Sequence, residues 1–551
     1  MQSPGYWPRL QKTRISRRAL IKGAGIAAAG AAGTALVACG GEGEEGVPAT
    51  RTAVPEGTPQ PGGTMRIGLP SDPVGLDPQL SVTSYWVGSR IHGYLFMVSL
   101  KDQSMLMELA ESFEQPDETT YVWKVRPGIK FQNIDPTWGR EVTAEDVVYS
   151  MERRRDEPTS QNDKQLLREF TAGFEATDKY TFRFRTNRPY SPTLDEVGNP
   201  SYAIVPREAV EKWGNLHLNA AGCGGYILKE FVKAERVEMV RNPDFFMSGR
   251  PYLDGMEFLV IPDQSSLLEA FKTKRLDYNG ATLDKIKVDD LRGIEGIVVV
   301  EAPNFWNPTL LLKVDRPPFK DIRVRKALDL ALDRQDLIDR MFFGDAKLNG
   351  PIVWSLEYYA LPQEELRDFY KYDPQEAKQL LGAAGYEDGL DVETTIENVV
   401  YMSQIATVVK EHFARVGVRC NLKPQELGVY LAQTLYPGNF EMTWFYNLPY
   451  VEPDRPLCQY FSKGQAGITF SGYDNPKMDE WIWKERSEFD REKRRQIIFD
   501  AQRAMLLEHG PQINTSTPRG YAAFWEWVKG VDVGIGAWGW LGLDTWMTKR
   551  T

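Results

Sequence analysis

Residues 109–131 read LAESFEQPDETTYVWKVRPGIKF, and residues 143–150 follow with TAEDVVYS. Residues 121–126 alternate apolar and polar side chains with period two, which predicts a half-buried strand. Residues 180–185 alternate in the same way. Thr143 and Asp146 have the spacing of a capping box, so we expect a helix to start there and run through Arg154. Strands and a helix within one short segment indicate a mixed α/β or α+β fold.

The same patterns extend over the rest of the chain, without a fixed repeat or heptad run. Helices are expected at 81–97, 264–275, 321–342, 375–384, 402–416, 475–489 and 491–508. Further strands are expected at 64–69, 225–231, 256–261, 308–314, 391–396, 417–422 and 440–446.

Length and composition describe a large acidic globular protein. The 551 residues exceed any single small domain, and 42% of them are hydrophobic, which is ample for several cores. The first 38 residues hold six Lys or Arg and no acid, so the remaining 60 cations and 76 acids give −16 from Cys39 onward. Such a charge argues against nucleic acid as a main partner. Four cysteines exclude a scaffold built on disulfides.

The amino-terminal segment has the features of an export signal. Residues 16–22 (SRRALIK) resemble a twin-arginine signal and precede an Ala/Gly-rich run. Residues 36–40 (LVACG) resemble a lipobox, which predicts a signal over 1–38 and lipidation of Cys39. A transmembrane helix is the alternative, but Lys22 interrupts the run and Ala and Gly give it little burial energy in lipid. Residues 39–62 are rich in Gly and Pro and predict a disordered tether.

Several strings in fixed order resemble one family along nearly the whole chain. They are GGTMRIG at 62–68, GLDP at 75–78, the region 109–150, RNPD at 241–244, PPFKDIRVRKA at 317–327 and GYDNP at 472–476. Together they resemble the family 5 solute-binding proteins of peptide-type ABC importers, whose members bind oligopeptides, dipeptides, nickel or oligosaccharides. The resemblance covers residue 62 to the carboxyl terminus.

The resemblance implies a two-lobed periplasmic-binding-protein clamp of type II with three structural domains. Domain I would comprise 63–102, 195–310 and 512–551, domain II 103–194, and domain III 311–511. A small or short oligomeric ligand would lie between domains I and III, and hinge closure around it would present the clamp to a membrane permease. With the lipobox-like string, we expect a lipid-anchored monomer on the outer face of the cytoplasmic membrane, with neither catalysis nor a cofactor.

One expected cleft strand departs from the family pattern. Residues 442–453 (MTWFYNLPYVEP) align with W-x-x-D-Y-x-D/E-P, whose Asp pairs with the α-ammonium of a peptide ligand. Asn447 or Pro449 occupies that place, depending on the end from which the alignment is counted. Enclosing an ammonium without a counter-charge is costly, so an oligosaccharide or another uncharged ligand is favoured over a peptide. An acid from another segment would restore the peptide alternative.

Aromatic and amide side chains are the candidate ligand contacts, because rings stack on sugar faces while amides and hydroxyls satisfy polar edges. The candidates are Trp444, Tyr446, Asn447 and Tyr450 on the cleft strand, Asn304 and Trp306 near the crossing between domains, Trp354 in a loop of domain III, and Ser81, Tyr85 and Trp86 after the GLDP turn. Core packing is the alternative for each ring.

Enzyme and metal alternatives find little support in the sequence. The four histidines, at 92, 217, 412 and 509, are isolated from one another, so we expect no metal site. Cys223 lies in a Gly-rich string that favours a tight turn over a nucleophile. An extracytoplasmic hydrolase remains the alternative of another class, although GxSxG is missing from the sequence. Pairing among Cys223, Cys420 and Cys458 stays open.

Overall fold

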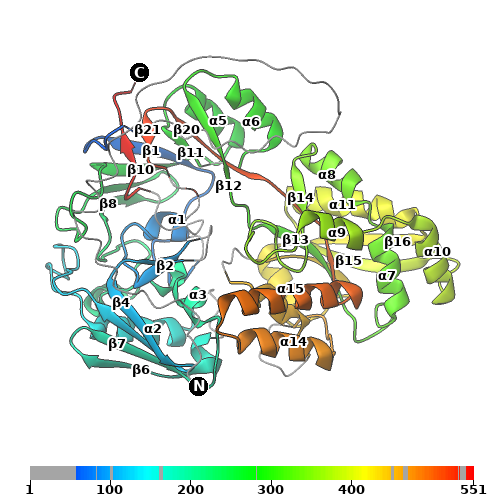
Figure 1. The fold of residues 1–551 in the computed structure, drawn as a ribbon. Helices are drawn as coiled ribbons and strands as arrows, with labels where there is room; N and C mark the ends of the chain where they lie inside the picture. The colour runs from blue at the N-terminus through cyan, green and yellow to red at the C-terminus, as the bar shows by residue number, and fades with distance from the viewer. Residues whose placement is uncertain are drawn as a thin grey trace, which may run out of the picture.

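The computed structural model describes residues 57–81, 84–99, 104–160, 166–280, 282–447, 452–462, 469–531, 533 and 542–550. The predicted signal, Cys39 and most of the predicted tether lie outside these residues. The described chain forms two lobes that meet along a central boundary (Figure 1). Helices and strands occur in both lobes, so the mixed fold and the two-lobed clamp are confirmed.

A seven-stranded sheet forms the upper part of the first lobe, and Figure 1 shows it at the upper left. Its order is β12 (Ile297–Ala302), β20 (Gly520–Trp525), β11 (Tyr278–Asn279), β1 (Thr64–Leu69), β10 (Gly255–Val260), β9 (Arg236–Arg241) and β8 (Tyr226–Val232). Met65 and Ile67 alternate with more exposed residues in β1 and are fully buried in the core of this lobe. Helices α5 (Gln264–Lys272) and α6 (Lys285–Arg292) belong to the same lobe.

A four-stranded antiparallel sheet completes the first lobe. Its order is β4 (Ala110–Asp117), β5 (Thr120–Val125), β7 (Thr181–Thr186) and β6 (Thr171–Asp178). The predicted alternation is confirmed, because Trp123 of β5 is fully buried and stacks on Phe182 of β7 with ring centroids 5.8 Å apart. The predicted capping box is also present at the start of α2 (Ala144–Asp156), where the Thr143 backbone N–H donates to the Asp146 carboxylate at 2.9 Å.

The second lobe is built on a five-stranded sheet with helices around it (Figure 1). The strand order is β16 (Val418–Gln425), β15 (Leu390–Glu397), β17 (Met442–Asn447), β13 (Asn307–Leu312) and β18 (Gln512–Asn514). The longer helices are α7 (Ile322–Ala331), α8 (Arg334–Phe342), α9 (Gln363–Phe369), α10 (Pro374–Ala383), α11 (Val400–Ala414), α14 (Pro476–Arg486) and α15 (Arg491–Leu507).

The remaining elements are short. They are α1 (Tyr85–Gly88), α3 (Thr193–Val197), α4 (Arg207–Trp213), α12 (Leu427–Val429), α13 (Asp454–Leu457), β2 (Phe96–Val98), β3 (Met105–Met107), β14 (Ala346–Leu348), β19 (Ser516–Pro518), β21 (Val528–Lys529), β22 (Trp546–Met547) and the irregular helical turns Leu166–Phe170, Pro200–Tyr202, Tyr430–Leu435 and Cys458–Tyr460. Within the described residues, no helix has the length and apolarity to cross a bilayer.

Two predicted helices differ from the structure. The helix expected at 81–97 is wrong, since among its described residues the α-helix is limited to Tyr85–Gly88 and β2 follows at Phe96. Gly88 packs so closely that a Cβ there would lie 2.4 Å from the Leu76 carbonyl oxygen, so tertiary packing and not helical periodicity shapes this segment. The helix expected at 321–342 is two helices, because Asp333 caps the second by accepting the Asp336 backbone N–H.

Two extended connections join the lobes at 303–306 and 515–519. Strands β12 and β20 pair antiparallel in the first lobe, and β13 and β18 pair antiparallel in the second, so both connections run side by side. Asn304 Nδ2 donates to the Pro518 carbonyl at 3.1 Å, and Thr517 Oγ1 donates to the Trp306 carbonyl at 2.5 Å. The first crossing therefore lies a few residues before the predicted boundary at 310. The second lies a few residues after the predicted boundary at 511.

Candidate ligand site between the lobes

A cavity of about 1010 Å³ lies where the two lobes and both connections meet. The first lobe contributes Trp86, Arg90, Tyr278, Asn279 and Tyr521. The second contributes Met341, Phe342, Glu397, Val399, Val400, Tyr401, Gln404 and Tyr446, and the connections contribute residues 302–306 and 518–520. Its size and mixture of rings with a few polar groups suit a small organic ligand.

Three aromatic rings cluster at the second-lobe side of this cavity. The ring of Trp306, on the first connection, meets Tyr401 of α11 edge-on with centroids 4.2 Å apart. Tyr446 of β17 lies 6.3 Å from Trp306, centroid to centroid. All three side chains are half-buried, so their remaining surface is available to a ligand.

Glu397 ends β15 beside these rings and lines the cavity. Its side chain is buried, with 7% of the residue exposed, and Oε2 finds no hydrogen-bond partner among the residues that the structure describes. Burial raises the pKa of Tyr446, and the neighbouring charge and hydrogen bond of Glu397 raise it further. No ion pair to Glu397 is formed within the described chain, so a carboxylate is held there without a counter-charge.

Arg90 is the opposite charge on the first-lobe side, in the turn after α1. Only 4% of the residue is exposed, and burial lowers the pKa of its guanidinium to about 10. The guanidinium donates to the Trp86 carbonyl and lies over the Phe258 ring at 5.2 Å, while Nε has no partner in the described parts of the chain. No described carboxylate pairs with it, so its charge is uncompensated.

The other charged side chains around the cavity have partners. Lys287 pairs with Asp284 at 2.7 Å, and Lys285 pairs with Asp289. Arg519 pairs with Glu301 at 3.0 Å and with Asp345 at 3.3 Å. Arg90 and Glu397 are thus the two lining charges that a ligand would neutralise, and they lie on different lobes.

Four of the predicted ligand contacts line this cavity: Trp86, Asn304, Trp306 and Tyr446. The Asn304 amide is already engaged, since it donates to Pro518 and its Oδ1 accepts the Trp306 backbone N–H at 3.1 Å. Asn304 therefore links the two connections as well as lining the cavity. The side chain of Asn447, and Tyr450 altogether, lie outside the described residues.

Four other predicted contacts are buried away from the cavity, as a correction to the sequence expectation. Trp444 is 2% exposed and lies in the second-lobe core. Trp354 is 5% exposed, and its Nε1 donates to the Thr517 carbonyl at 2.9 Å. Ser81 and Tyr85 are also buried, and burial raises the pKa of Tyr85 to about 12. Their sequence positions beside the cleft segments did not reveal how deep these side chains lie.

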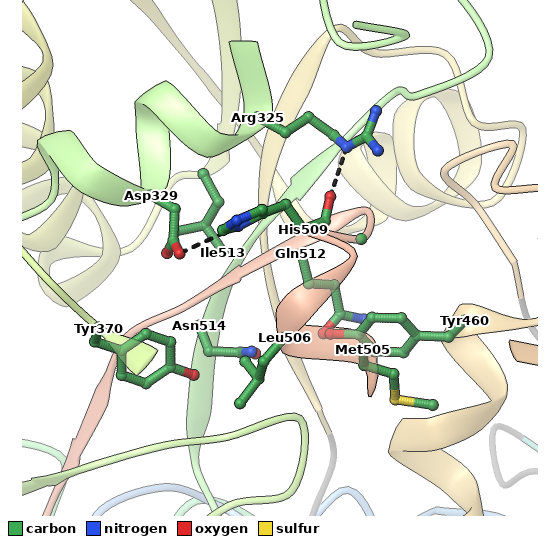
Figure 2. A pocket seen from close by; sticks show the side chains of 11 residues that line it. Arg325, Asp329, Tyr370, Tyr460, Met505, Leu506, His509, Gln512, Ile513 and Asn514 are labelled. Carbon is green, nitrogen blue, oxygen red and sulfur yellow. Dashed lines mark hydrogen bonds and ion pairs between the residues drawn. The ribbon is translucent and has the colours of Figure 1, made fainter. Parts of the chain in front are cut away.

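A second pocket, in the second lobe, is too small for a ligand (Figure 2). Its volume is about 10 Å³, enough for one water at most. Figure 2 shows His509 Nδ1 facing the Asp329 carboxylate, 3.5 Å away, and Arg325 Nε donating to the His509 carbonyl at 2.6 Å. The charged and polar groups of this pocket therefore pair with one another and have a structural role.

The described chain shows neither a disulfide nor a group of side chains that could hold a metal ion. Cys223, Cys420 and Cys458 are free and buried, and burial raises the pKa of each thiol. Beside Cys223, a Cβ on Gly222 would lie 2.3 Å from the Ile91 carbonyl oxygen, so glycine allows two distant segments to pack closely here. Over the described residues, no three His, Cys, Asp or Glu side chains are grouped to hold a metal ion.

Comparison with known proteins gives one consistent answer. The profile "Bacterial extracellular solute-binding proteins, family 5 Middle" matches residues 105–467. The "Dipeptide-binding protein" of Escherichia coli K12 is 26% identical over 471 residues, 79% of this chain and 85% of that protein. The structure of DppA from Helicobacter pylori with the peptide STSA has a TM-score of 0.74 at 23% identity, over 89% of this chain and 99% of that one. AgaA from A. tumefacien, in complex with agropinic acid, has a TM-score of 0.75 at 21% identity, over 89% and 99%. This chain belongs to family 5 of the bacterial extracellular solute-binding proteins.

Proposed function

We propose that this protein is the substrate-binding component of an ABC importer and that it captures an acid-bearing small ligand, a short peptide or a related amino-acid derivative, between its lobes. The observation that carries the ligand class is the buried, uncompensated Arg90 in the cavity. A neutral oligosaccharide, which the sequence favoured, would leave that charge buried and unpaired. The protein would bind and release its ligand without changing it chemically.

The energetics of Arg90 support an anionic ligand group. Holding an unpaired guanidinium out of water costs several kcal/mol, and a carboxylate that reaches it would offset this cost through charge-assisted hydrogen bonds. Nε, which has no described partner, is one donor available to such a group. The matched relatives fit this class, since one is named for dipeptides and two structures hold a peptide or agropinic acid.

A titration of pooled tripeptides tests the proposal. The wild type should bind free-acid tripeptides at least about tenfold tighter than the same peptides as carboxyl-terminal amides. A difference of this size is typical of the affinity that one charge-assisted hydrogen bond contributes. Arg90→Met should remove this preference and, because it deletes an unpaired buried charge, should leave the unliganded protein at least as stable. Arg275→Met, which alters an exposed arginine of the same lobe, is the matched control.

Two outcomes would overturn the proposal. One is equal affinity for acids and amides. The other is binding of a neutral trisaccharide such as maltotriose with no binding of either peptide pool, which would restore the oligosaccharide alternative. Turnover of a bound peptide by the purified wild type would instead support the hydrolase.

We further propose that the protein is held as a monomer on the outer face of the cytoplasmic membrane by a lipid on Cys39. The support is the lipobox-like string at 36–40 and the Gly/Pro-rich segment that follows it. Two or more acyl chains give stable anchoring, so the clamp would stay near its permease without a spanning helix. Fractionation of a Cys39→Ser variant tests this anchor.

A further inference from the structure

Four side chains from separate elements form what we call the Glu397 box: Glu397 at the end of β15, Trp306 on the first connection, Tyr401 in the first turn of α11 and Tyr446 on β17. All four line the cavity between the lobes. The box lies on the second lobe, whereas Arg90 lies on the first.

The box combines a negative charge with aromatic surface. Glu397 is more than nine-tenths buried, and its Oε2 is without a partner in the described chain. The Tyr401 hydroxyl is likewise buried without a described partner. Ring faces carry negative electrostatic potential, so the carboxylate and the rings all favour a positive guest.

The chemistry of the box selects among cations. A hard metal ion needs several oxygen ligands, and the box offers one carboxylate beside rings that are not ligands for such an ion. An alkylammonium group suits both parts, because its charge pairs with the carboxylate while its carbon-bound surface lies against the rings. A neutral sugar would leave Glu397 buried and unpaired.

We infer that the Glu397 box is the subsite for an alkylammonium group of the ligand, an inference that rests on the proposed capture of that ligand in the cavity. Asn447 and Pro449 supply no acid for this role, and Glu397 supplies it from another strand. A ligand with an ammonium in the box and a carboxylate at Arg90 would contact both lobes with opposite charges. Such a ligand would bind the closed clamp better than the open one, as ligand-driven closure requires.

The test uses tetramethylammonium, with tert-butanol as a neutral probe of similar shape. Saturation-transfer NMR on the methyl protons should detect binding of the cation, and not of the alcohol, to the wild type. Glu397→Gln keeps the shape of the side chain and should weaken cation binding at least about tenfold. Glu393→Gln is the matched control on the same strand, because Glu393 is exposed and already pairs with Lys423, and it should leave binding unchanged.

Variants at Tyr401 keep the test valid if Glu397→Gln folds poorly. Tyr401→Ala removes the ring and should weaken cation binding severalfold, whereas Tyr401→Phe keeps the ring and should weaken it less. Absence of cation binding to the folded wild type, or equal binding to wild type and Glu397→Gln, would overturn the inference. Equal binding of cation and alcohol would do the same.

Arg90→Met separates this inference from the proposed function. Tetramethylammonium has no carboxylate, so its binding should survive Arg90→Met while the preference for peptide acids is lost. If the cation binds through Glu397 but the acid preference is missing in the wild type, the proposed ligand class fails and the box stands. If the acid preference is present but the cation binds without Glu397, the box fails and the proposed function stands.

Discussion

Side chains on one face of a strand can lie at very different depths, and β17 shows the consequence. Trp444 and Tyr446 point to the same side, yet Trp444 pairs with Leu310 inside the sheet while Tyr446 pairs with Pro308 near the connection between the lobes. Only Tyr446 lines the cavity. Alternation in the sequence predicts the face of a strand but not the distance from its end. The sequence could therefore identify the strand and propose both rings, but it could not tell that Tyr446 lines the cavity and Trp444 does not.

Replacing Trp444 by Ala should act on folding and not primarily on the ligand. The ring is 2% exposed within the second-lobe core, so its removal should lower the free energy of unfolding by about 3 to 5 kcal/mol. Trp306→Ala, at a half-buried ring beside the cavity, should cost less stability and weaken ligand binding more. Urea unfolding and ligand titration on both variants check this, and unchanged unfolding with lost binding in Trp444→Ala would contradict it.

Element positions followed from periodicity wherever one side of a segment is buried. β1 was predicted at 64–69 and occupies Thr64–Leu69, and the helix at 491–508 is α15 at Arg491–Leu507. The segment 81–97 failed because its conformation depends on close packing against Leu76. Arg90 lies in that segment, and its position as a lone cation among apolar residues is the one sequence feature that marks it as a site candidate. Glu397 has no such feature, because it ends an ordinary strand.

Helices α14 and α15 contact the first lobe near α3 through a buried charge cluster (Figure 1). Arg494 of α15 pairs with Glu485 of α14 at 2.8 Å, with Asp195 of α3 at 3.2 Å and with Glu452. Burial raises the pKa of Glu485 to about 8 and that of Glu452 well above its usual range, against the attraction of Arg494. Arg486 of α14 pairs with Asp454 beside this cluster at 2.6 Å, so two guanidiniums face four buried carboxylates. Two positive charges cannot compensate four negative ones, so the cluster retains protons near neutral pH.

Unfolding of the wild type should therefore depend on pH through Glu485. Its folded pKa of about 8 exceeds the unfolded value of about 4.3, so the folded state binds more protons between these limits and this contribution to stability falls as pH rises from 5 to 8. Glu485→Gln mimics the protonated form and should remove that contribution. Relative to wild type, the variant should gain on the order of 1 to 3 kcal/mol between pH 5 and 8.

Urea unfolding of both proteins at pH 5, 6.5 and 8 measures this difference. Asp479→Asn serves as a matched control, because Asp479 is a buried acid of α14 outside the Arg494 cluster that accepts the Ser462 backbone N–H. It should not reproduce the pH-dependent gain of Glu485→Gln. A wild-type minus variant difference that is constant with pH would show that Glu485 is ionised in the folded protein.

At the scale of the whole molecule, the order of short strings along the chain predicted the two-lobed clamp, because each string marks an element of a fold shared by the family. The place where the chain crosses between the lobes could not be predicted as well from the sequence. β13 starts at Asn307 and β18 ends at Asn514 because β13 pairs with β17 on one side and with β18 on the other. Such long-range pairing leaves no mark in the local sequence. The domain limits at 102 and 194 stay predictions.

Membrane attachment should be separable from the clamp. Between Cys39 and β1 lie 24 residues of largely Gly- and Pro-rich sequence. A flexible chain of that length would span about 25 to 30 Å, so replacement of Cys39 should not disturb either lobe. Cys39→Ser should move the protein from the membrane pellet to the soluble fraction and abolish incorporation of labelled fatty acid, with ligand affinity and unfolding unchanged. Cys420→Ser, at a buried thiol of β16, should remain in the pellet. Retention of Cys39→Ser in the pellet would instead indicate that the apolar run before residue 39 itself holds the protein in the bilayer.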